Sequence, residues 1–340
     1  MSEQSIPPTL LDVAREAGVS LATASRVLNG SERIVAASYR ERVEAAADRI
    51  GYRANVSAQT MARGTSRTAA LLVSDIADPF FSSIAAGVAE AAEAAGLLVT
   101  MAVTGRDAER ELDLVRTLRG LRPQVVVLVG SRPIDEHGRE ELVRELQGVR
   151  AAGGRVVVIG QHELPFPTVR VDDGAGAAAL AVSLAELGHR GFAALGGPER
   201  LGAARERLEG FRAGLAAAGV ALDPARVYHG AFTRDGGYQA ASQMLRDGLT
   251  GLDALFAVND VMAIGALSAL REAGVAVPDR LAVAGFDDIP TARDTAPELT
   301  TVRIPLESLG QHAIELALTG DSTTLVLPTE VVLRASTTRS

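Results

Sequence analysis

The sequence predicts a small all-α unit at the N-terminus, followed by a two-lobed α/β domain built on parallel sheets. Residues 9–50 hold three short helical segments and no strand pattern, whereas from Ala69 onward β-branched runs alternate with runs of helical length. Strands that alternate with helices in this way form parallel sheets covered by helices. Because there are too many such units for one compact sheet, we expect two lobes with a cleft between them.

Composition narrows the class of protein. The chain has 340 residues, of which 47% are hydrophobic and 22% charged, with a net charge of −8 and no cysteine. These values are typical of a globular protein of two or three domains. The absence of cysteine excludes a disulfide scaffold, Cys-ligated zinc and thiol catalysis. No apolar run approaches the roughly 18 residues of a membrane span, and the N-terminus lacks a signal-peptide pattern. We therefore expect a cytoplasmic protein with no membrane partner.

The N-terminal segment has the signals of a helix-turn-helix unit. The first helix begins at Thr9, which has capping-box spacing to Asp12. A second helix begins after Ser20 and stops at Asn29, and a third covers residues 38–50. The turn between the first two helices has three residues, which is typical of this DNA-binding motif.

The second of these helices starts with Leu21 and Ala22 and carries no charge in its first turn. Because the N-terminal residues of a recognition helix contact base edges in the major groove, such a start allows close approach and apolar contact with the bases. Hydrogen bonds to the DNA are then expected from the polar residues of the same stretch, which are Ser20, Thr23, Ser25, Arg26 and Asn29. The alternative is that Leu21 is an ordinary exposed leucine.

The remainder of the chain is assigned to alternating elements. Strands are expected at 69–74, 97–103, 125–130, 155–160, 168–172, 191–196, 254–258 and 281–286. Helices are expected at 82–95, 107–119, 138–152, 174–187, 202–218, 234–247 and 260–273. Polar turns follow several strands, and ligands of open α/β sheets bind at the carboxyl ends of strands. The sequence therefore predicts a ligand site among these turns.

These segments resemble the LacI/GalR (lactose-repressor) family of bacterial transcription regulators. The resemblance covers almost the whole chain and depends on the order of TLLDVAREAGVSLATASRVLNG, AQTMARG, DPFF, LGHRGFAALGGP, ARERLEGF, FAVNDVMAIGAL, AGFDD and LTTVRIP. It implies a helix-turn-helix headpiece over residues 1–53, a hinge helix or linker over 54–67, and a periplasmic-binding-protein-like (type I) effector and dimerisation domain over 68–340. Within that domain the N-lobe is expected at about 68–162 and 292–323, and the C-lobe at about 163–291 and 324–340.

The resemblance also implies partners and contacts. A homodimer is expected to bind double-stranded, pseudo-palindromic operator DNA in association with the nucleoid. Its DNA contacts are expected from Thr9, Leu10, Ser20, Leu21, Ala22, Thr23, Ser25, Arg26, Asn29, Tyr52, Asn55, Ala58 and Met61. The family usually has Leu at Met61, Arg at Gln59 and a Ser cap at Ala36. We therefore expect Met61 to wedge between base steps of the minor groove, with a hinge and a third helix that are held slightly less firmly.

For the effector, the resemblance implies a small molecule, with a sugar as the first expectation and a nucleobase or another metabolite as the alternative. The expected contacts are Asp78, Phe80, Gln161, Arg205, Phe232, Asn259 and Asp287. Planar charged groups suit sugar hydroxyls, and aromatic rings suit the apolar face of a sugar. The implied function is an effector-controlled transcription regulator, most simply a repressor.

Two other functions and a cofactor-like motif agree less well with the sequence. An exported solute-binding protein would need a signal peptide and no helix-turn-helix. A sugar-acting enzyme would need a catalytic constellation, but the five histidines are scattered and no HExxH, GxSxG or P-loop motif is present. The stretch GAGAAA at 174–179 resembles a dinucleotide fingerprint, yet two acids, Asp172 and Asp173, precede it where they would repel a pyrophosphate. We expect no enzyme activity, no metal and no cofactor, and we interpret this stretch as a helix of small residues that packs closely on its sheet.

Overall fold

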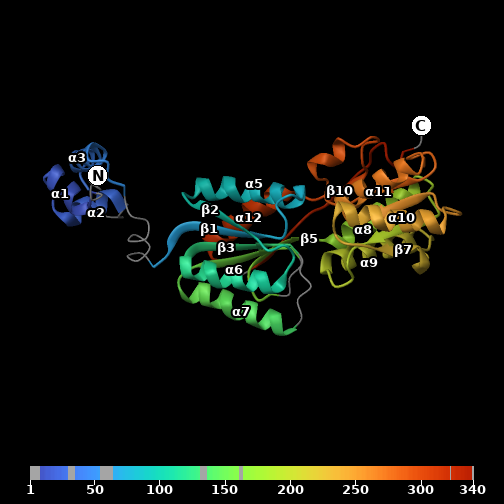
Figure 1. Cartoon of the computed structure of the whole chain (residues 1–340), viewed down its shortest axis with the longest axis horizontal. Helices are drawn as coiled ribbons and strands as arrows, with labels where there is room; N and C mark the ends of the chain where they lie inside the picture. Colours follow the sequence, from blue (N-terminus) through green and yellow to red (C-terminus); the bar gives the residue numbers. More distant parts are fainter. Residues whose placement is uncertain are drawn as a thin grey trace, which may run out of the picture. The chain divides into compact units, whose positions relative to one another are not determined.

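The computed structural model describes residues 8–29, 35–53, 64–130, 136–160, 164–321 and 323–338, and it divides into two units, Met1–Ser66 and Arg67–Ser340 (Figure 1). The described part of the first unit contains helices α1 (Leu10–Ala17), α2 (Leu21–Asn29) and α3 (Ala37–Arg49). Their small core is formed by buried Val13, Ala14, Ala17, Ala24, Val43, Ala46 and Ala47.

The predicted helix starts of this unit are confirmed by side-chain hydrogen bonds. The Asp12 carboxylate accepts from the backbone N–H of Thr9 at 2.9 Å, and the Thr9 hydroxyl accepts from the N–H of Asp12. The Ser20 hydroxyl accepts from the N–H of Thr23 at 3.1 Å, so Ser20 caps α2. Ala36 precedes α3 and provides no side-chain cap, as its methyl group dictates.

The N-lobe of the second unit is a six-stranded sheet with the strand order β11-β5-β4-β3-β1-β2. Its strands are β1 (Ser66–Val73), β2 (Leu98–Val103), β3 (Pro123–Val129), β4 (Arg155–Ile159), β5 (Thr168–Val171) and β11 (Thr324–Leu327). Helices α5 (Pro79–Ala94) and α12 (Leu306–Thr319) cover one face, and α6 (Ala108–Leu121) and α7 (Glu136–Ala151) cover the other (Figure 1). The side chains of β1 alternate between these two cores, with Leu71 facing one and Leu72 the other.

The C-lobe is built on a four-stranded parallel sheet with the order β7-β6-β8-β9. Its strands are β6 (Phe192–Gly196), β7 (Val227–His229), β8 (Ala254–Ala257) and β9 (Ala282–Ala284). Helix α8 (Asp173–Glu186) packs against α9 (Gly202–Ala217), and α10 (Arg234–Asp247) packs against α11 (Asp260–Glu272).

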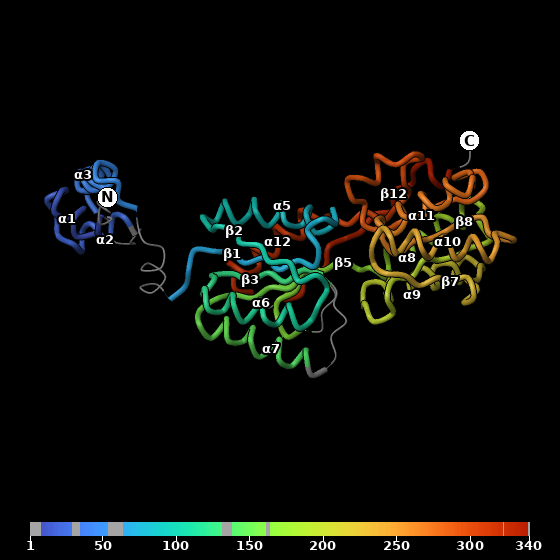
Figure 2. Tube along the Cα trace, viewed as in Figure 1, coloured from blue at the N-terminus to red at the C-terminus, as the bar shows by residue number. Residues whose placement is uncertain are grey.

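The chain passes between the lobes three times, from β5 to α8, from β10 (Thr301–Arg303) to α12, and from β11 to β12 (Glu330–Val332) (Figure 2). Strands β10 and β12 form a two-stranded antiparallel ladder. Isolated bridges join Thr300 to Ala284 and Arg303 to Asp287, so β10 lies against the C-lobe.

The expected lobe boundaries are wrong at these crossings. Strands β5 and β11, which were assigned to the C-lobe, pair with each other and extend the N-lobe sheet. Residues 292–303, assigned to the N-lobe, instead bond to the C-lobe. Short strands of three or four residues have no periodicity that could reveal which sheet edge they join. For the same reason β7, β10, β11 and β12 were not predicted, and helix α12 was not predicted either.

The GAGAAA stretch begins helix α8, as expected, and packs closely on a neighbour. A methyl group at Gly210 of α9 would collide with the carbonyl of Gly174, and one at Gly214 would collide with that of Ala178. The surface that α8 meets so closely is therefore helix α9, whereas the sequence suggested the sheet. Across the described ranges of the chain, no helix is long and apolar enough to cross a membrane.

Candidate DNA-reading helix and effector cavity

Helix α2 presents an exposed, uncharged first turn. Ala24 is fully buried in the core of the N-terminal unit, whereas Leu21 is 47% exposed and Ala22 is also exposed. Arg26 lies on the exposed side as well. The Ser20 and Thr23 hydroxyls lie 2.9 Å apart and bond to each other, so Arg26 remains the long polar side chain of this surface.

The other predicted DNA contacts differ in their surroundings. Thr9 uses its side chain in the cap of α1, and Leu10 and Tyr52 are half-buried against the core of the unit. Helix α2 ends at Asn29, whose side chain lies outside the described part of the chain. The residues of the predicted hinge also lie outside the described part of the chain. They are Asn55, Ala58, Gln59 and Met61.

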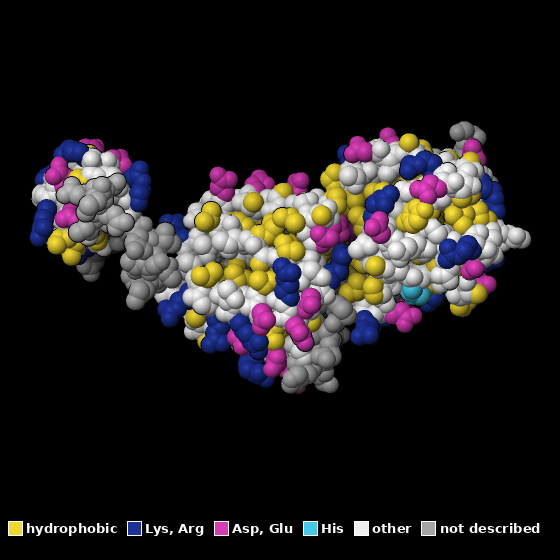
Figure 3. Space-filling view, in the orientation of Figure 1, with side chains coloured by type: hydrophobic (Ala, Val, Ile, Leu, Met, Phe, Trp, Pro, Cys, Tyr) yellow, Lys and Arg dark blue, Asp and Glu magenta, His cyan; other side chains and the backbone are white. Residues whose placement is uncertain are grey.

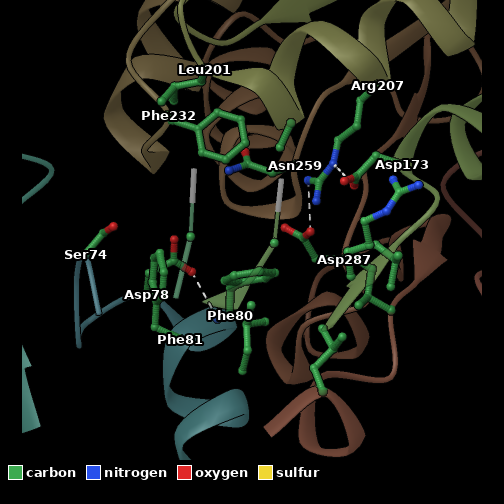
Figure 4. A pocket seen from close by; sticks show the side chains of 18 of the residues that line it. Ser74, Asp78, Phe80, Phe81, Asp173, Leu201, Arg207, Phe232, Asn259 and Asp287 are labelled. Atoms are coloured by element: carbon green, nitrogen blue, oxygen red, sulfur yellow. Dashed lines mark hydrogen bonds and ion pairs between the residues drawn. The ribbon is translucent and has the colours of Figure 1, made fainter. Parts of the chain in front are cut away.

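A cavity lies between the two lobes of the second unit (Figure 4). It brings together five of the seven predicted effector contacts, namely Asp78, Phe80, Phe232, Asn259 and Asp287. The rings of Phe80, on α5 of the N-lobe, and Phe232, before α10 of the C-lobe, face the cavity from opposite sides (Figure 4). Gln161, a sixth prediction, lies outside the described residues.

The prediction for Arg205 is wrong. Arg205 is exposed and lines a separate pocket with Glu209, Arg212 and His229. The arginine that reaches the cavity is Arg207, two residues further along α9. Two residues turn a helix by about 200°, so neighbours at this spacing point in opposite directions.

Arg207 is held by two carboxylates inside the cavity wall. Its Nε donates to Asp173 Oδ1 at 2.7 Å, and its Nη1 lies 2.9 Å from Asp287 Oδ1. All three side chains are at most 5% exposed. The guanidinium carbon also lies 4.1 Å from the centre of the Phe286 ring, a cation–π distance. One buried cation is thus paired with two buried acids, and this pairing offsets the cost of burying its charge.

Asp287 keeps an unused acceptor. Arg207 Nη1 donates to the carbonyl of Val258 and also forms the ion pair with Asp287 Oδ1, but among the described residues this buried oxygen accepts no hydrogen bond of good geometry. Burial raises the pKa of Asp287 well above its ordinary value, and Arg207 only partly opposes this. Because Asp287 lines the cavity, its carboxyl is an acceptor suited to a ligand hydroxyl.

Two further polar groups are oriented by helix caps. Asp78 caps α5 by accepting from the N–H of Phe80 at 3.0 Å, and Arg106 lies 3.6 Å from its second oxygen. Burial is also the main reason that the pKa of Asp78 is raised. Asn259 caps α11 through its carbonyl oxygen, which accepts from the N–H of Met262 at 3.0 Å, and this leaves its amide group as a donor for the cavity.

Sequence comparison assigns this architecture to a family. Residues 9–55 match the model for bacterial regulatory proteins of the lacI family, and residues 181–337 match a periplasmic binding protein-like domain. The chain is 35% identical over 340 residues to the HTH-type transcriptional regulator CelR of Thermobifida fusca, which covers 97% of this chain and 98% of that protein. The chain belongs to the LacI family. It is also 33% identical over 342 residues to the HTH-type transcriptional repressor CytR of Escherichia coli (strain K12), with 98% of each chain covered.

Solved structures agree with this assignment. The Lac repressor dimer bound to operator and the anti-inducer ONPF has a TM-score of 0.83 at 29% identity and covers 98% of this chain and 100% of that one. A complex of the transcriptional regulator CelR with cellobiose has a TM-score of 0.69 at 33% identity, with 97% and 99% covered. The resemblance and the predicted fold class are confirmed. This LacI-family chain is a transcription regulator with a DNA-binding helix-turn-helix and is not an enzyme.

The sequence did contain a signal for the missed arginine. On α9, Arg207 falls on the buried stripe with Ala204, Leu208 and Phe211, at helical spacings of three and four residues. An arginine on the apolar stripe of a helix requires a buried acid, and Asp173 and Asp287 are the two that it finds. From the sequence, Asp173 is expected only to repel a pyrophosphate. Ser74, whose buried hydroxyl also lines the cavity, has no comparable sequence signal.

Proposed function

We propose that this LacI-family chain is a repressor whose affinity for a pseudo-palindromic operator is set by an uncharged carbohydrate bound between the lobes. The observation that carries this proposal is the Arg207–Asp173–Asp287 cluster, which faces a cavity lined by phenylalanine rings from both lobes. Rings that cover an apolar ligand face and fixed polar groups along its edge are a combination that suits a sugar. The binding of cellobiose by the related regulator CelR supports the same class.

The charges around the cavity favour a neutral ligand. Among the described residues, three carboxylates line it, those of Asp78, Asp173 and Asp287. Each lining arginine already has an acid nearby: Arg207 has two, Arg106 lies beside Asp78, and Arg170 acts on Glu206. A phosphate or carboxylate on the ligand would compete for cations that are already paired and would be repelled by the acids. Sugar hydroxyls avoid this cost, because they can donate to the carboxylates.

A thermal-shift assay on the full chain tests the ligand class with matched pairs. Glucose is compared with glucose 6-phosphate, galactose with galacturonate, and cellobiose with cellobionate, and adenine and guanosine are added as separate probes. A ligand at about 100 times its Kd adds about 2.7 kcal/mol to the free energy of unfolding. We expect at least one neutral sugar to raise the melting temperature and its anionic partner to have no effect. Stabilisation by the anionic members alone, or by the nucleobase probes alone, would overturn the proposed ligand class.

The DNA function is tested on an operator selected by the full chain from random duplexes. Fluorescence anisotropy then gives the operator Kd with and without the sugar found above. An inducer-controlled repressor requires the sugar to weaken binding, because a ligand shifts the equilibrium only by its different affinities for the two states. Operator affinity should also fall steeply with salt, since the headpiece neutralises phosphates. Tighter binding with sugar would contradict the inducer role, and a salt-insensitive affinity would contradict the proposed contacts.

A homodimer is part of the proposal. Strand β2 is an edge of the N-lobe sheet, and two of its large apolar side chains are exposed, Leu98 by 68% and Met101 by 41%. Figure 3 shows apolar side chains gathered on the side of this lobe that carries β2 and α5. An exposed apolar edge strand is usually covered in the functional assembly. The related Lac repressor is a dimer on its operator, which supports this state.

A further inference from the structure

We propose that Asp288 is a positioning residue that fixes the effector-facing Asp287 to the lobe-crossing strand β10, so that the turn formed by these two acids couples the cavity to the crossing. This inference rests on the proposed effector function. It adds a role for residues that do not line the cavity, namely Asp288, Arg303 and Arg334.

The first link is made by the backbone. The N–H of Asp287 donates to the carbonyl of Val302 at 2.9 Å, and the N–H of Ile304 donates to the carbonyl of Asp287 at 3.2 Å. The residue that faces the ligand is therefore hydrogen-bonded on both sides to the strand that crosses between the lobes. Asp287 and Asp288 have φ angles of 121° and 54°, which non-glycine residues rarely adopt. Such a conformation persists only where the surroundings hold it in place.

The second link is the Asp288 side chain, which points to a different set of partners. Its carboxylate is 1% exposed and accepts from Arg303 Nε at 2.7 Å and from Arg334 Nη2 at 2.6 Å. Arg303 is on β10, and Arg334 follows β12, the strand that pairs with β10. One buried carboxylate therefore joins the turn that carries Asp287 to strand β10 and to the segment that follows β12.

A third link comes from the start of helix α11. Asp260 follows the cavity-lining Asn259, and its carboxylate accepts from the Thr301 hydroxyl at 2.6 Å and from the N–H of Ile289 at 3.0 Å. Thr301 is the first residue of β10. The turn and the helix cap that orient two ligand-facing groups are thus both bonded to the same strand.

These contacts show where, along this crossing, the chain leaves the C-lobe and enters the N-lobe. Strand β10 is bonded to the C-lobe as far as Ile304, and helix α12 of the N-lobe begins at Leu306. Pro305 alone separates them. Helix α12 packs against α5, the helix that carries Phe80 into the cavity. A displacement of Asp287 by ligand would therefore move β10 and act on α12 directly, through rigid hydrogen-bonded elements.

The test compares three variants of the full chain. Arg303→Gln removes one bond to Asp288, Asp288→Asn weakens the whole cluster, and Glu330→Gln is the matched control. Glu330 bonds to the same Arg303 at 2.9 Å from the neighbouring strand but does not contact the turn. For each variant, anisotropy gives the operator Kd without sugar and with saturating sugar. The sugar is whichever of glucose, galactose and cellobiose gives the largest thermal shift with the wild-type chain.

The coupling is tested by the ratio of the operator Kd with saturating sugar to the operator Kd without sugar. A residue with a merely structural role would leave this ratio unchanged when it is substituted. We expect Arg303→Gln and Asp288→Asn to reduce this ratio about threefold or more, while the sugar-free operator Kd stays within about twofold of wild type. Glu330→Gln should keep the wild-type ratio. Because the Arg303 side chain is 40% exposed, Arg303→Gln keeps the test open if Asp288→Asn fails to fold.

The possible failures can be told apart. If the wild-type chain shows no sugar response, the proposed function fails. If the wild-type chain responds and folded Arg303→Gln responds equally, the coupling role is refuted and the effector function stands. An equal loss in Glu330→Gln would also refute it, because the effect would then come from the ladder and not from Asp288.

Discussion

The two walls of the effector cavity are built differently. The C-lobe wall is polar and internally bonded: Arg207, Asp173 and Asp287 form one buried cluster, and Asn259 is fixed by its helix cap. The N-lobe wall has more apolar side chains, among them Phe80, Phe81, Ile159 and Leu309, and its charged residues in the described part of the chain are Asp78, Arg106 and Arg170.

This difference separates two tasks. Polar groups that are bonded to one another before a ligand arrives hold fixed directions, and in the proposed function they would give the C-lobe its selectivity at low reorganisation cost. An apolar wall contributes burial without strict geometry, so it can close on the ligand from the other side. We therefore expect substitutions in the C-lobe cluster to damage folding and binding together, and substitutions in the N-lobe wall to damage binding alone.

The largest expected effect comes from Arg207→Gln. This change leaves Asp173 and Asp287 buried beside each other without their cation, which costs about 3–5 kcal/mol of stability. Urea denaturation monitored by circular dichroism measures the loss. Arg205→Gln on the same helix is the matched control and should stay within about 0.5 kcal/mol of wild type, because Arg205 is exposed. Equal stabilities for the two variants would refute the view that the cluster holds the C-lobe wall together.

A smaller effect is expected from Phe80→Ala. The half-buried ring covers one face of the cavity, so its removal should weaken sugar binding by about 1–2 kcal/mol, roughly tenfold in Kd. Without sugar, the melting temperature should change little. Isothermal titration calorimetry gives the affinity, and Ile76→Ala serves as a control because Ile76 is 54% exposed on the loop before α5. If Phe80→Ala lowered the stability as much as Arg207→Gln does, the proposed difference in task between the two walls would be refuted.

The sequence predicted the headpiece, the α/β alternation and most of the cavity because those features have local signals. Thr9 and Ser20 are helix caps, and Asp78, Asn259 and Asp287 occupy turns at strand ends, where ligands of α/β folds bind. The choice between Arg205 and Arg207 depends on which face of α9 is buried. The spacing of the buried residues of α9 identifies that face and places Arg207 on it. The crossings could not be predicted, since the partners of Asp288 lie 15 and 46 residues away in the chain.

The acids of the C-lobe also predict a dependence of stability on pH. Burial raises the pKa of Asp260 to about 6, and the same cause raises the pKa of Asp287. Below its ordinary pKa of 3.8 the Asp260 carboxyl is protonated in both states, and its stabilising contribution is fully present. That contribution is lost as the pH rises from 3.8 to about 6, because the unfolded state has then released its proton while the folded state still holds it, and above about 6 both states are ionised and the loss is complete.

We therefore expect this residue to make the free energy of unfolding fall between pH 4 and pH 6, by at most about 1.4 kcal/mol per pH unit. Urea titrations across this range compare wild type with Asp260→Asn, in which the slope should be shallower. Asp113→Asn is the control, since the Asp113 side chain is 75% exposed on the outer face of the N-lobe helix α6. An unchanged slope in Asp260→Asn would show that the buried acid takes up no proton in this range.

The smallest expected effect lies in the headpiece, where the contact surface is apolar without being buried. Leu21 and Ala22 form the exposed, uncharged start of α2, and an apolar contact with a thymine methyl is worth about 1 kcal/mol, or roughly fivefold in relative affinity. Replacing both residues, as in Leu21→Gln with Ala22→Asn, should change the preferred operator in a selection from random duplexes. Sugar affinity and the stability of the second unit should remain as in wild type. If the selected operator does not change, Leu21 is an ordinary exposed leucine, and base reading falls to Arg26 and its polar neighbours.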